Sequence, residues 1–179
     1  MSTRAAPFWL VILTPKAQLE SAFEITPTWL ADRNLKGLAL DIDNTLAPTH
    51  LPGNEAQIRA WLEPFRQAKI PIRVISNGHS KRILEFCQLF KLEFVGILGS
   101  RMAAKPIPSA FQRACQELNL PASQIAMVGD QIFTDVLGAN MAGMYTVLVK
   151  PLTERSLPHT KLIRNLEKLV LAKLEREKT

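Results

Sequence analysis

The sequence predicts an α/β protein in which helices cover both faces of a parallel sheet. Short apolar runs such as residues 37–41 and Ile125–Gly129 alternate with segments whose apolar residues recur at helical spacing. Continuous apolar runs are typical of strands buried on both faces, which occur mainly in parallel sheets. A length of 179 residues with 47% hydrophobic and 21% charged residues fits one soluble domain. We therefore expect a three-layer, Rossmann-like arrangement.

Five apolar runs predict the strands, at residues 37–41, 70–76, 94–98, Ile125–Gly129 and Tyr145–Val149. Helical periodicity between these runs predicts helices at residues 54–68, Ser80–Phe90, Pro108–Leu118 and 134–141. The first of these helices is expected to bend or end near Pro64, because proline removes a backbone donor. A last helix is expected in the C-terminal segment, where an apolar stripe contains Leu162, Ile163, Leu166, Leu169, Val170 and Leu174.

The apolar run Phe8–Leu13 is too short to span a bilayer and lacks the cleavage site of a signal peptide. We expect it to form a core strand or to make a shallow contact with a membrane interface. The two cysteines, Cys87 and Cys115, are too few for a disulfide framework and fit a reducing compartment. These features favour a cytoplasmic protein.

The net charge of +6 lies mainly near the C-terminus, where residues 150–179 hold eight Lys and Arg and four Glu. The chain has one Tyr, and its basic residues do not alternate with aromatic ones, so a nucleic-acid partner is not expected. Two interpretations of the basic segment stay open. It is a solvated helix face, or it contacts the anionic surface of a membrane from its inner side.

Four of the five aspartates fall in two short segments, as Asp41 and Asp43 and as Asp130 and Asp135. Both segments follow predicted strands, and ligands of parallel sheets bind at the carboxyl ends of the strands. Carboxylates from two strands, together with Lys105 on an intervening loop, suggest Mg²⁺ facing an anion. The sequence thus predicts a metal and phosphate site at this edge.

Ser76 and the backbone N–H groups of Asn77 and Gly78 follow the second predicted strand, at the start of a helix that could hold a phosphate. A metal, a cationic side chain and a spare carboxylate complete the requirements for phosphoryl transfer. A carboxylate can itself serve as the nucleophile. Two competing motifs fail, because the DIDNT segment lacks the Gly and Glu of a calcium loop and no P-loop is present.

Four segments resemble, in order, the four motifs of the haloacid-dehalogenase superfamily. Residues 38–46 (LALDIDNTL) resemble motif I, the Ser76-Asn77 pair motif II, Lys105-Pro106 motif III and residues 128–140 (VGDQIFTDVLGAN) an extended motif IV. The resemblance covers residues 35–152 and points to subclass IIIA and its YqeG-type branch. This branch is similar to phosphatidylglycerophosphate phosphatases.

The resemblance implies that Asp41 attacks phosphorus and forms a phosphoenzyme. Asp43 would protonate the leaving alkoxide and then activate the water that hydrolyses the intermediate. Thr45 would orient this loop, and Lys105 would offset the negative charge around Asp41.

The same resemblance implies a Mg²⁺ cofactor held by Asp41, Asp130 and the backbone carbonyl of Asp43. Asp135 would serve as a further metal ligand or as a partner of one. Ser76, Asn77 and Lys105 would bind the phosphate of the substrate.

Haloacid-dehalogenase phosphatases often enclose the site with a cap domain, but this sequence leaves no room for one. There are 32 residues between Asp43 and Ser76 and 28 between Ser76 and Lys105. An open site suits a phospholipid head group, and the resemblance implies hydrolysis of phosphatidylglycerophosphate to phosphatidylglycerol. A soluble phosphate monoester as substrate and a catalytically silent module that binds membranes or proteins are the alternatives.

Three parts of a single domain are expected on these grounds. Residues 1–34 form an N-terminal extension that packs on the core, residues 35–152 form the phosphatase core, and residues 153–179 form a basic amphipathic helix. The oligomeric state does not follow from the sequence.

Overall fold

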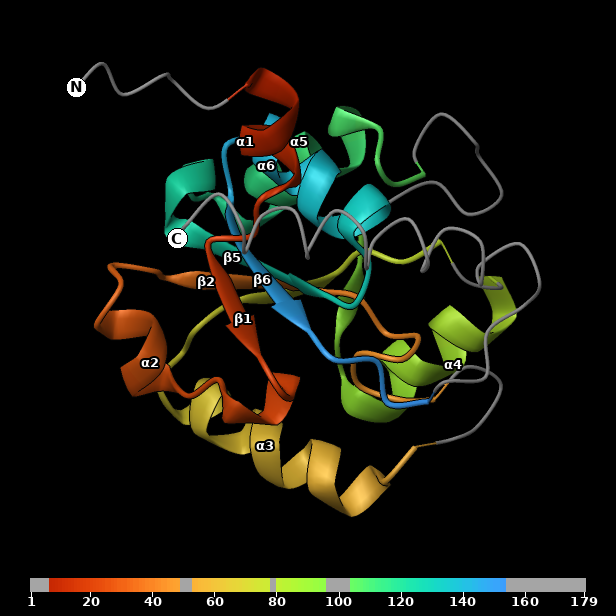
Figure 1. Cartoon of the computed structure of the whole chain (residues 1–179). Coiled ribbons are helices and arrows are strands. Elements are labelled where there is room, and N and C mark those ends of the chain that lie inside the picture. The colour runs from red at the N-terminus through yellow and green to blue at the C-terminus, as the bar shows by residue number, and fades with distance from the viewer. Residues whose placement is uncertain (1–6, 49–52, 78–79, 96–103, 154–179) are drawn as a thin grey trace.

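A computed structural model describes residues 7–48, 53–77, 80–95 and 104–153. Its centre is a six-stranded sheet in the order β1-β6-β5-β2-β3-β4, and every neighbouring pair is parallel (Figure 1). The strands are β1 (Ala17–Leu19), β2 (Gly37–Leu40), β3 (Ile72–Val74), β4 (Glu93–Phe94), β5 (Ile125–Gly129) and β6 (Tyr145–Val149). The parallel sheet predicted from the apolar runs is confirmed.

Helices cover both faces of this sheet, as Figure 1 shows. One side carries α2 (Pro27–Ala31), α3 (Glu55–Gln67) and α4 (Ser80–Phe90), and the other carries α1 (Phe8–Leu13), α5 (Pro108–Leu118) and α6 (Leu137–Met141). Shorter turns lie at η1 (Ala22–Glu24) and η3 (Ala122–Gln124), and a π-helical turn, η4 (Ile132–Val136), precedes α6. No inserted cap domain is present in the described part of the chain.

The alternation of side chains along β2 explains why two cores form. Leu38 and Leu40 pack into the cluster under α3 and α4, whereas Ala39 packs into the cluster under α5. All three side chains are fully buried, so the strand contacts a helical layer on each face. Ala39 and Phe111 belong to the same cluster on the α5 side.

The N-terminal segment is part of this architecture. Strand β1 extends the sheet beside β6, and Ala22, Ile25 and Leu30 are buried in the larger core. The indole N–H of Trp61 in α3 donates a hydrogen bond of 2.8 Å to the carbonyl oxygen of Ile25. This contact fixes the segment before α2 against α3.

Three predicted features differ from the structure. Phe8–Leu13 forms the helix α1 instead of a core strand, and it packs on α6 and η4. Helix α3 continues through Pro64 to Gln67, so this proline does not end it. The strand β1 and the helix α2 were not predicted, and both are short, with three and five residues.

Two predicted elements lie wholly or partly outside the described residues. The structure places β4 at Glu93–Phe94, and the remainder of the strand predicted at residues 94–98 falls largely in the undescribed range 96–103. The predicted C-terminal helix lies beyond residue 153. None of the described helices is long and apolar enough to cross a membrane.

Candidate active site

Three carboxylates meet at the carboxyl ends of the central strands. Asp41 follows β2 and Asp130 follows β5, and these strands are neighbours. The backbone N–H of Asp41 donates to the carbonyl oxygen of Val128 at 2.9 Å, which continues the ladder to the site. Asp41, Asp130 and Asp135 are all buried, and one oxygen from each lies within 4.8 Å of the others. The structure therefore gathers three of the four predicted acidic residues into one cluster.

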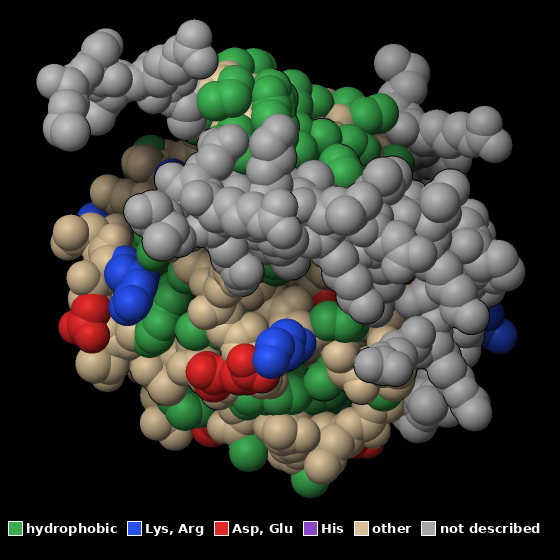
Figure 2. Space-filling view, in the orientation of Figure 1, with side chains coloured by type: hydrophobic (Ala, Val, Ile, Leu, Met, Phe, Trp, Pro, Cys, Tyr) green, Lys and Arg blue, Asp and Glu red, His purple; other side chains and the backbone are tan. Residues whose placement is uncertain are grey.

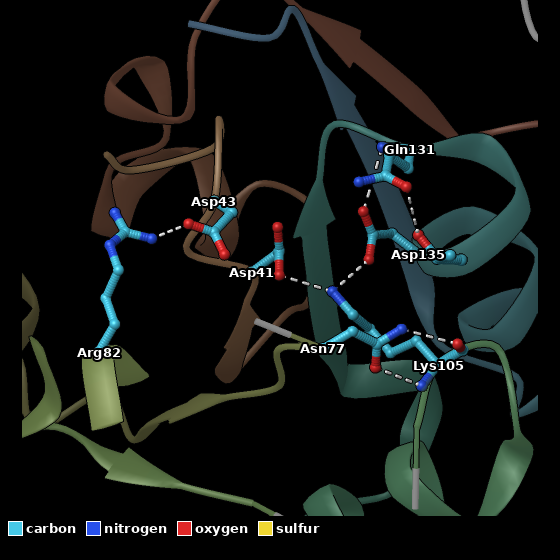
Figure 3. A network of polar contacts seen from close by, with 8 residues as sticks. Asp41, Asp43, Asn77, Arg82, Lys105, Gln131 and Asp135 are labelled. Carbon is cyan, nitrogen blue, oxygen red and sulfur yellow. Dashed lines mark hydrogen bonds and ion pairs between the residues drawn. The ribbon is translucent and has the colours of Figure 1, made fainter. Parts of the chain in front are cut away.

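Lys105 brings a positive charge to this cluster. Its Nζ lies 2.6 Å from Oδ1 of Asp41 and 2.6 Å from Oδ1 of Asp135 (Figure 3). The backbone of Lys105 is held by Asn77, whose Nδ2 donates to the lysine carbonyl and whose Oδ1 accepts from the lysine N–H, both at 2.8 Å. Asn77, in the loop after β3, thus holds the backbone of Lys105 in a position from which its side chain reaches Asp41.

Asp135 reaches the cluster because the chain forms a π-helical turn after β5. The N–H groups of Asp135 and Val136 both donate to the carbonyl of Gln131, and the Gln131 N–H donates back to Oδ2 of Asp135 at 3.1 Å. The carboxylate of Asp135 lies against Gly129, where any side chain would overlap with it. Extra residues in π-helical turns are common at functional sites.

The charges of the cluster shift two pKa values. Burial alone would lower the pKa of Lys105, but Asp135 and Asp41 outweigh this effect and raise it above its usual value. Burial raises the pKa of Asp135 to about 6, an increase that Lys105 partly offsets and the charge of Asp41 reinforces. The lysine is therefore held as an ammonium ion, and burial disfavours the ionised form of Asp135.

The loop that follows Asp41 folds back on itself. The N–H groups of Thr45, Leu46 and Ala47 all donate to the carbonyl of Ile42. Asn44 adopts a left-handed conformation (φ 62°), which asparagine tolerates better than most residues. The hydroxyl of Thr45 is buried and has no hydrogen-bond partner among the described residues, so it remains available to a ligand in the site.

Asn44 also connects this loop to the chain beyond β6. Its carbonyl oxygen accepts from the N–H of Leu152 at 2.9 Å, and its Oδ1 accepts from the hydroxyl of Thr153 at 2.8 Å. The last described residues therefore fix the middle of the loop between Asp43 and Thr45.

Asp43 is not part of the buried cluster. Its Oδ1 accepts a hydrogen bond from the Nη1 of Arg82, a residue in the first turn of α4. Figure 3 shows Asp43 between this guanidinium and Asp41. Ser76 lies half-buried after β3, in the loop that also carries Asn77. Gly78, which was expected to offer a backbone N–H, lies outside the described residues.

The donors of the cluster fit a divalent cation. Three carboxylates and one ammonium carry a formal net charge of −2 in a buried position, and one divalent cation would neutralise it. Carboxylate oxygens are the ligands that Mg²⁺ prefers, and Mg²⁺ is usually held by one or two carboxylates together with waters and phosphate. Asp41, Asp130 and Asp135 therefore suit magnesium.

Four residues with contacts at the site were missed from the sequence: Arg82, Gly129, Gln131 and Asn44. A signal existed for two of them. Gly129 directly precedes Asp130, and a glycine beside a buried carboxylate indicates a close approach of the backbone. Asn44 lies in the tight DIDNT turn, where asparagine favours a left-handed conformation. The contacts of Arg82 depend on how distant segments pack, so no local pattern predicts them. Those of Gln131 lie within its own turn, with Thr134 and Asp135.

The chain is similar to several known proteins. The family described as HAD-hydrolase-like matches residues 102–162, which include Lys105, Asp130 and Asp135. A Bacillus subtilis (strain 168) protein named "Probable phosphatase YqeG" is 32% identical over 163 residues, which cover 91% of this chain and 92% of the relative. An Arabidopsis thaliana protein named "Phosphatidylglycerophosphate phosphatase 1, chloroplastic/mitochondrial" is 28% identical over 151 residues, covering 82% of this chain and 43% of the relative.

Solved structures share the fold at lower identity. An uncharacterised protein from Listeria monocytogenes serotype 4b matches with a TM-score of 0.51 and 21% identity, covering 69% of this chain and 85% of its own. A Had-superfamily hydrolase from Ehrlichia chaffeensis matches with a TM-score of 0.50 and 15% identity. The match covers 76% of this chain and 98% of the hydrolase. At these identities the likeness concerns the fold alone.

Proposed function

The chain belongs to the haloacid-dehalogenase superfamily, in its YqeG-type branch, and on this premise we propose that it is a Mg²⁺-dependent phosphatase. The proposed reaction is hydrolysis of a phosphate monoester through an aspartyl-phosphate on Asp41. The observation that carries this proposal is the position of Lys105, whose ammonium lies 2.6 Å from both Asp41 and Asp135 beside a third buried carboxylate.

Each residue of the site has a task in this mechanism. Oδ2 of Asp41 attacks phosphorus, while Lys105 compensates the charge of Oδ1 and keeps the carboxylate oriented. The leaving alkoxide takes a proton from Asp43, which then accepts a proton from the water that hydrolyses the phosphoenzyme. Thr45 orients the loop that carries both aspartates through the hydrogen bond from its backbone N–H to the carbonyl of Ile42.

The phosphate of the substrate would be held by Ser76, by the backbone of the Asn77 loop and by Lys105. Asp41, Asp130, Asp135 and the carbonyl of Asp43 would hold Mg²⁺, which would supply positive charge for a phosphate oxygen of the substrate.

We propose phosphatidylglycerophosphate as the substrate, hydrolysed at the inner face of a membrane. An Arabidopsis relative bears the name of this activity, and the described part of the chain holds no inserted cap domain that would exclude a substrate anchored in a bilayer. Figure 2 shows hydrophobic side chains gathered over α1 at the top of the molecule. In α1, Phe8 is 77% and Val11 57% exposed, and exposed apolar patches often mark interaction surfaces.

The experiment compares phosphate release from phosphatidylglycerophosphate in mixed micelles with release from glycerol 3-phosphate and p-nitrophenyl phosphate, with Mg²⁺ and with EDTA. We expect hydrolysis that requires Mg²⁺ and a clear preference for the lipid. Equal or faster turnover of the soluble esters would reject the lipid assignment and favour a soluble monoester as substrate. Mg²⁺-independent hydrolysis, or none on any substrate, would reject the mechanism and favour the binding module.

Substitution of the two loop aspartates tests their roles. Asp41→Asn is expected to abolish turnover, because the amide is not a nucleophile, and to leave the fold intact. Asp43→Asn is expected to slow turnover by roughly 10²–10⁴, the usual effect of losing acid–base catalysis. Steady-state phosphate release measures both effects, and a near-normal rate in either variant would contradict the assignment.

A further inference from the structure

Arg82 makes a contact that the proposed mechanism does not use. It lies in the first turn of α4, yet its guanidinium reaches the loop that follows Asp41. From this contact we infer that Arg82 is a positioning residue that holds the carboxylate of Asp43 in its working orientation. The inference rests on the proposed function, because it assigns a task to Arg82 within the same reaction.

The guanidinium bridges two points of one loop. Nη1 donates to Oδ1 of Asp43, and Nη2 donates to the carbonyl oxygen of Pro48 at 2.9 Å. The planar fork of an arginine is preorganised for two such bonds, whereas a lysine ammonium is a single point charge. Arg82 thereby fixes the loop at both Asp43 and Pro48 and joins it to α4.

The geometry leaves one carboxylate oxygen of Asp43 for chemistry. The terminal torsion of an aspartate is broad, so an unrestrained carboxylate samples many orientations. Because Arg82 binds Oδ1, the torsion is restrained and Oδ2 is presented for proton transfer. The side chains of Arg82 and Asp43 are 24% and 21% exposed, so water competes only partly for their contact.

Proton balance is unaffected by this assignment. The proton passes from Asp43 to the leaving alkoxide, and Asp43 later recovers one from the attacking water, while Arg82 keeps all of its own. A small displacement of a reacting group can cost about a hundredfold in rate. Loss of Arg82 should therefore lower kcat by about 10- to 100-fold, which is less than the loss of Asp43 itself.

A matched control stands next to Arg82 in the chain. Lys81 occupies the same helical turn, its side chain is 81% exposed, and it pairs with Glu85 at 3.9 Å. Lys81→Ala removes one positive charge from the same turn without touching Asp43. Comparison of the two variants separates the specific contact from the general loss of charge.

The experiment measures kcat, KM and inhibition by inorganic phosphate for Arg82→Ala, Arg82→Lys and Lys81→Ala, each with Mg²⁺ and each checked by thermal melting. We expect Arg82→Ala to lower kcat while KM and the inhibition constant of phosphate stay within about twofold of the wild type. Arg82→Lys should recover part of the rate, and millimolar guanidinium should accelerate Arg82→Ala but not Lys81→Ala.

A double-mutant cycle provides the decisive comparison. If Arg82 acts through Asp43, then Arg82→Ala costs nothing further in the Asp43→Asn background. Additive losses of kcat in the double variant would overturn the inference, and so would a normal kcat in Arg82→Ala. An effect of Arg82→Ala on KM alone would also overturn it, because it would indicate direct contact with substrate. If Arg82→Ala melts at a lower temperature than the wild type but is still accelerated by guanidinium, the result supports the contact between Arg82 and Asp43. If guanidinium does not accelerate Arg82→Ala, the result contradicts this contact.

The outcomes also separate this inference from the proposed function. An inactive wild-type protein would count against both. An active wild type whose Arg82→Ala variant is unimpaired would count against the inference alone.

Discussion

At the scale of the residue, the absence of a side chain at position 129 leaves the space that the carboxylate of Asp135 occupies. A Cβ at Gly129 would overlap with the carboxylate of Asp135 and would lie 2.6 Å from its Cβ. Gly129→Ala should therefore displace Asp135 from Lys105 and lower both Mg²⁺ affinity and kcat, by at least tenfold for kcat. Titration of Mg²⁺ against initial rate measures both changes.

The clash predicts a simple control for this variant. In an Asp135→Gly background the carboxylate and the Cβ are both gone, so addition of Gly129→Ala should cost little more. A further large loss in the double variant would show that position 129 matters for another reason.

The two thiols offer a second prediction at this scale. Burial raises the pKa of Cys87 to about 11, and it also raises the pKa of the half-buried Cys115. At pH 8 only about one Cys87 thiol in a thousand is ionised, and the thiolate is the reactive form. Iodoacetamide should therefore modify the native protein slowly, Cys115 first, with the Cys87 rate rising up to about pH 11. Peptide mass spectrometry measures each site, and rapid labelling of Cys87 at pH 8 would contradict its burial.

At the scale of the element, one amide side chain fastens the first helix to the sheet layer. Nδ2 of Asn140 in α6 donates to the carbonyl oxygens of Ile12 and Thr14, both at 2.9 Å, and its Oδ1 accepts from the hydroxyl of Thr146. Asn140→Ala removes three hydrogen bonds and leaves partly buried groups unpaired. The free energy of unfolding should fall by about 2–3 kcal/mol.

Urea unfolding followed by circular dichroism measures this change. Gln67→Ala is the control, because the amide of Gln67 is exposed and makes one weak contact, with Glu63 at 3.3 Å. Equal stability losses in the two variants would show that Asn140 does not hold α1.

The elements also show which patterns in a sequence carry structural information. Ile125–Gly129 and Pro108–Leu118 were predicted at their observed bounds, because a continuous apolar run and a proline in the first turn are local signals. Helix α2 also has a local signal, because the Thr26 hydroxyl caps its first turn and Pro27 begins it. By contrast, β1 has three residues and exists because it pairs with β6. No local pattern encodes such a pairing.

The same distinction applies to the site. Asp41, Asp130 and Lys105 were singled out because each follows a strand or lies in a motif, and the structure brings them together. The pairing of Asp43 with Arg82 could not be predicted, since 39 positions separate these residues and only the packing of α4 places them in contact.

At the scale of the whole molecule, a net positive chain encloses a net negative site. The chain carries a formal charge of +6, whereas the buried cluster of three carboxylates and one lysine carries −2. A divalent cation that binds the folded state alone stabilises it by about 2.7 kcal/mol at a concentration one hundred times its Kd. Mg²⁺ should therefore raise the melting temperature above that measured in EDTA.

Asp130→Asn should weaken this thermal shift, because it removes one of the three carboxylates. The control is Asp32→Asn, which makes the same change of charge at an exposed position at the end of α2. Differential scanning fluorimetry with and without Mg²⁺ compares the variants independently of any substrate. A shift that Asp130→Asn leaves intact would place the cation elsewhere.

The two hydrogen bonds that Asn44 accepts from Leu152 and Thr153 have a mechanical consequence. Tension applied to the polypeptide beyond Thr153 reaches the reactive loop through these hydrogen bonds as well as β6 through the backbone. Immobilising the enzyme by a handle placed just after this point would therefore disturb catalysis more than an attachment at the opposite end. The rate of the immobilised protein should therefore depend on which end of the chain is attached.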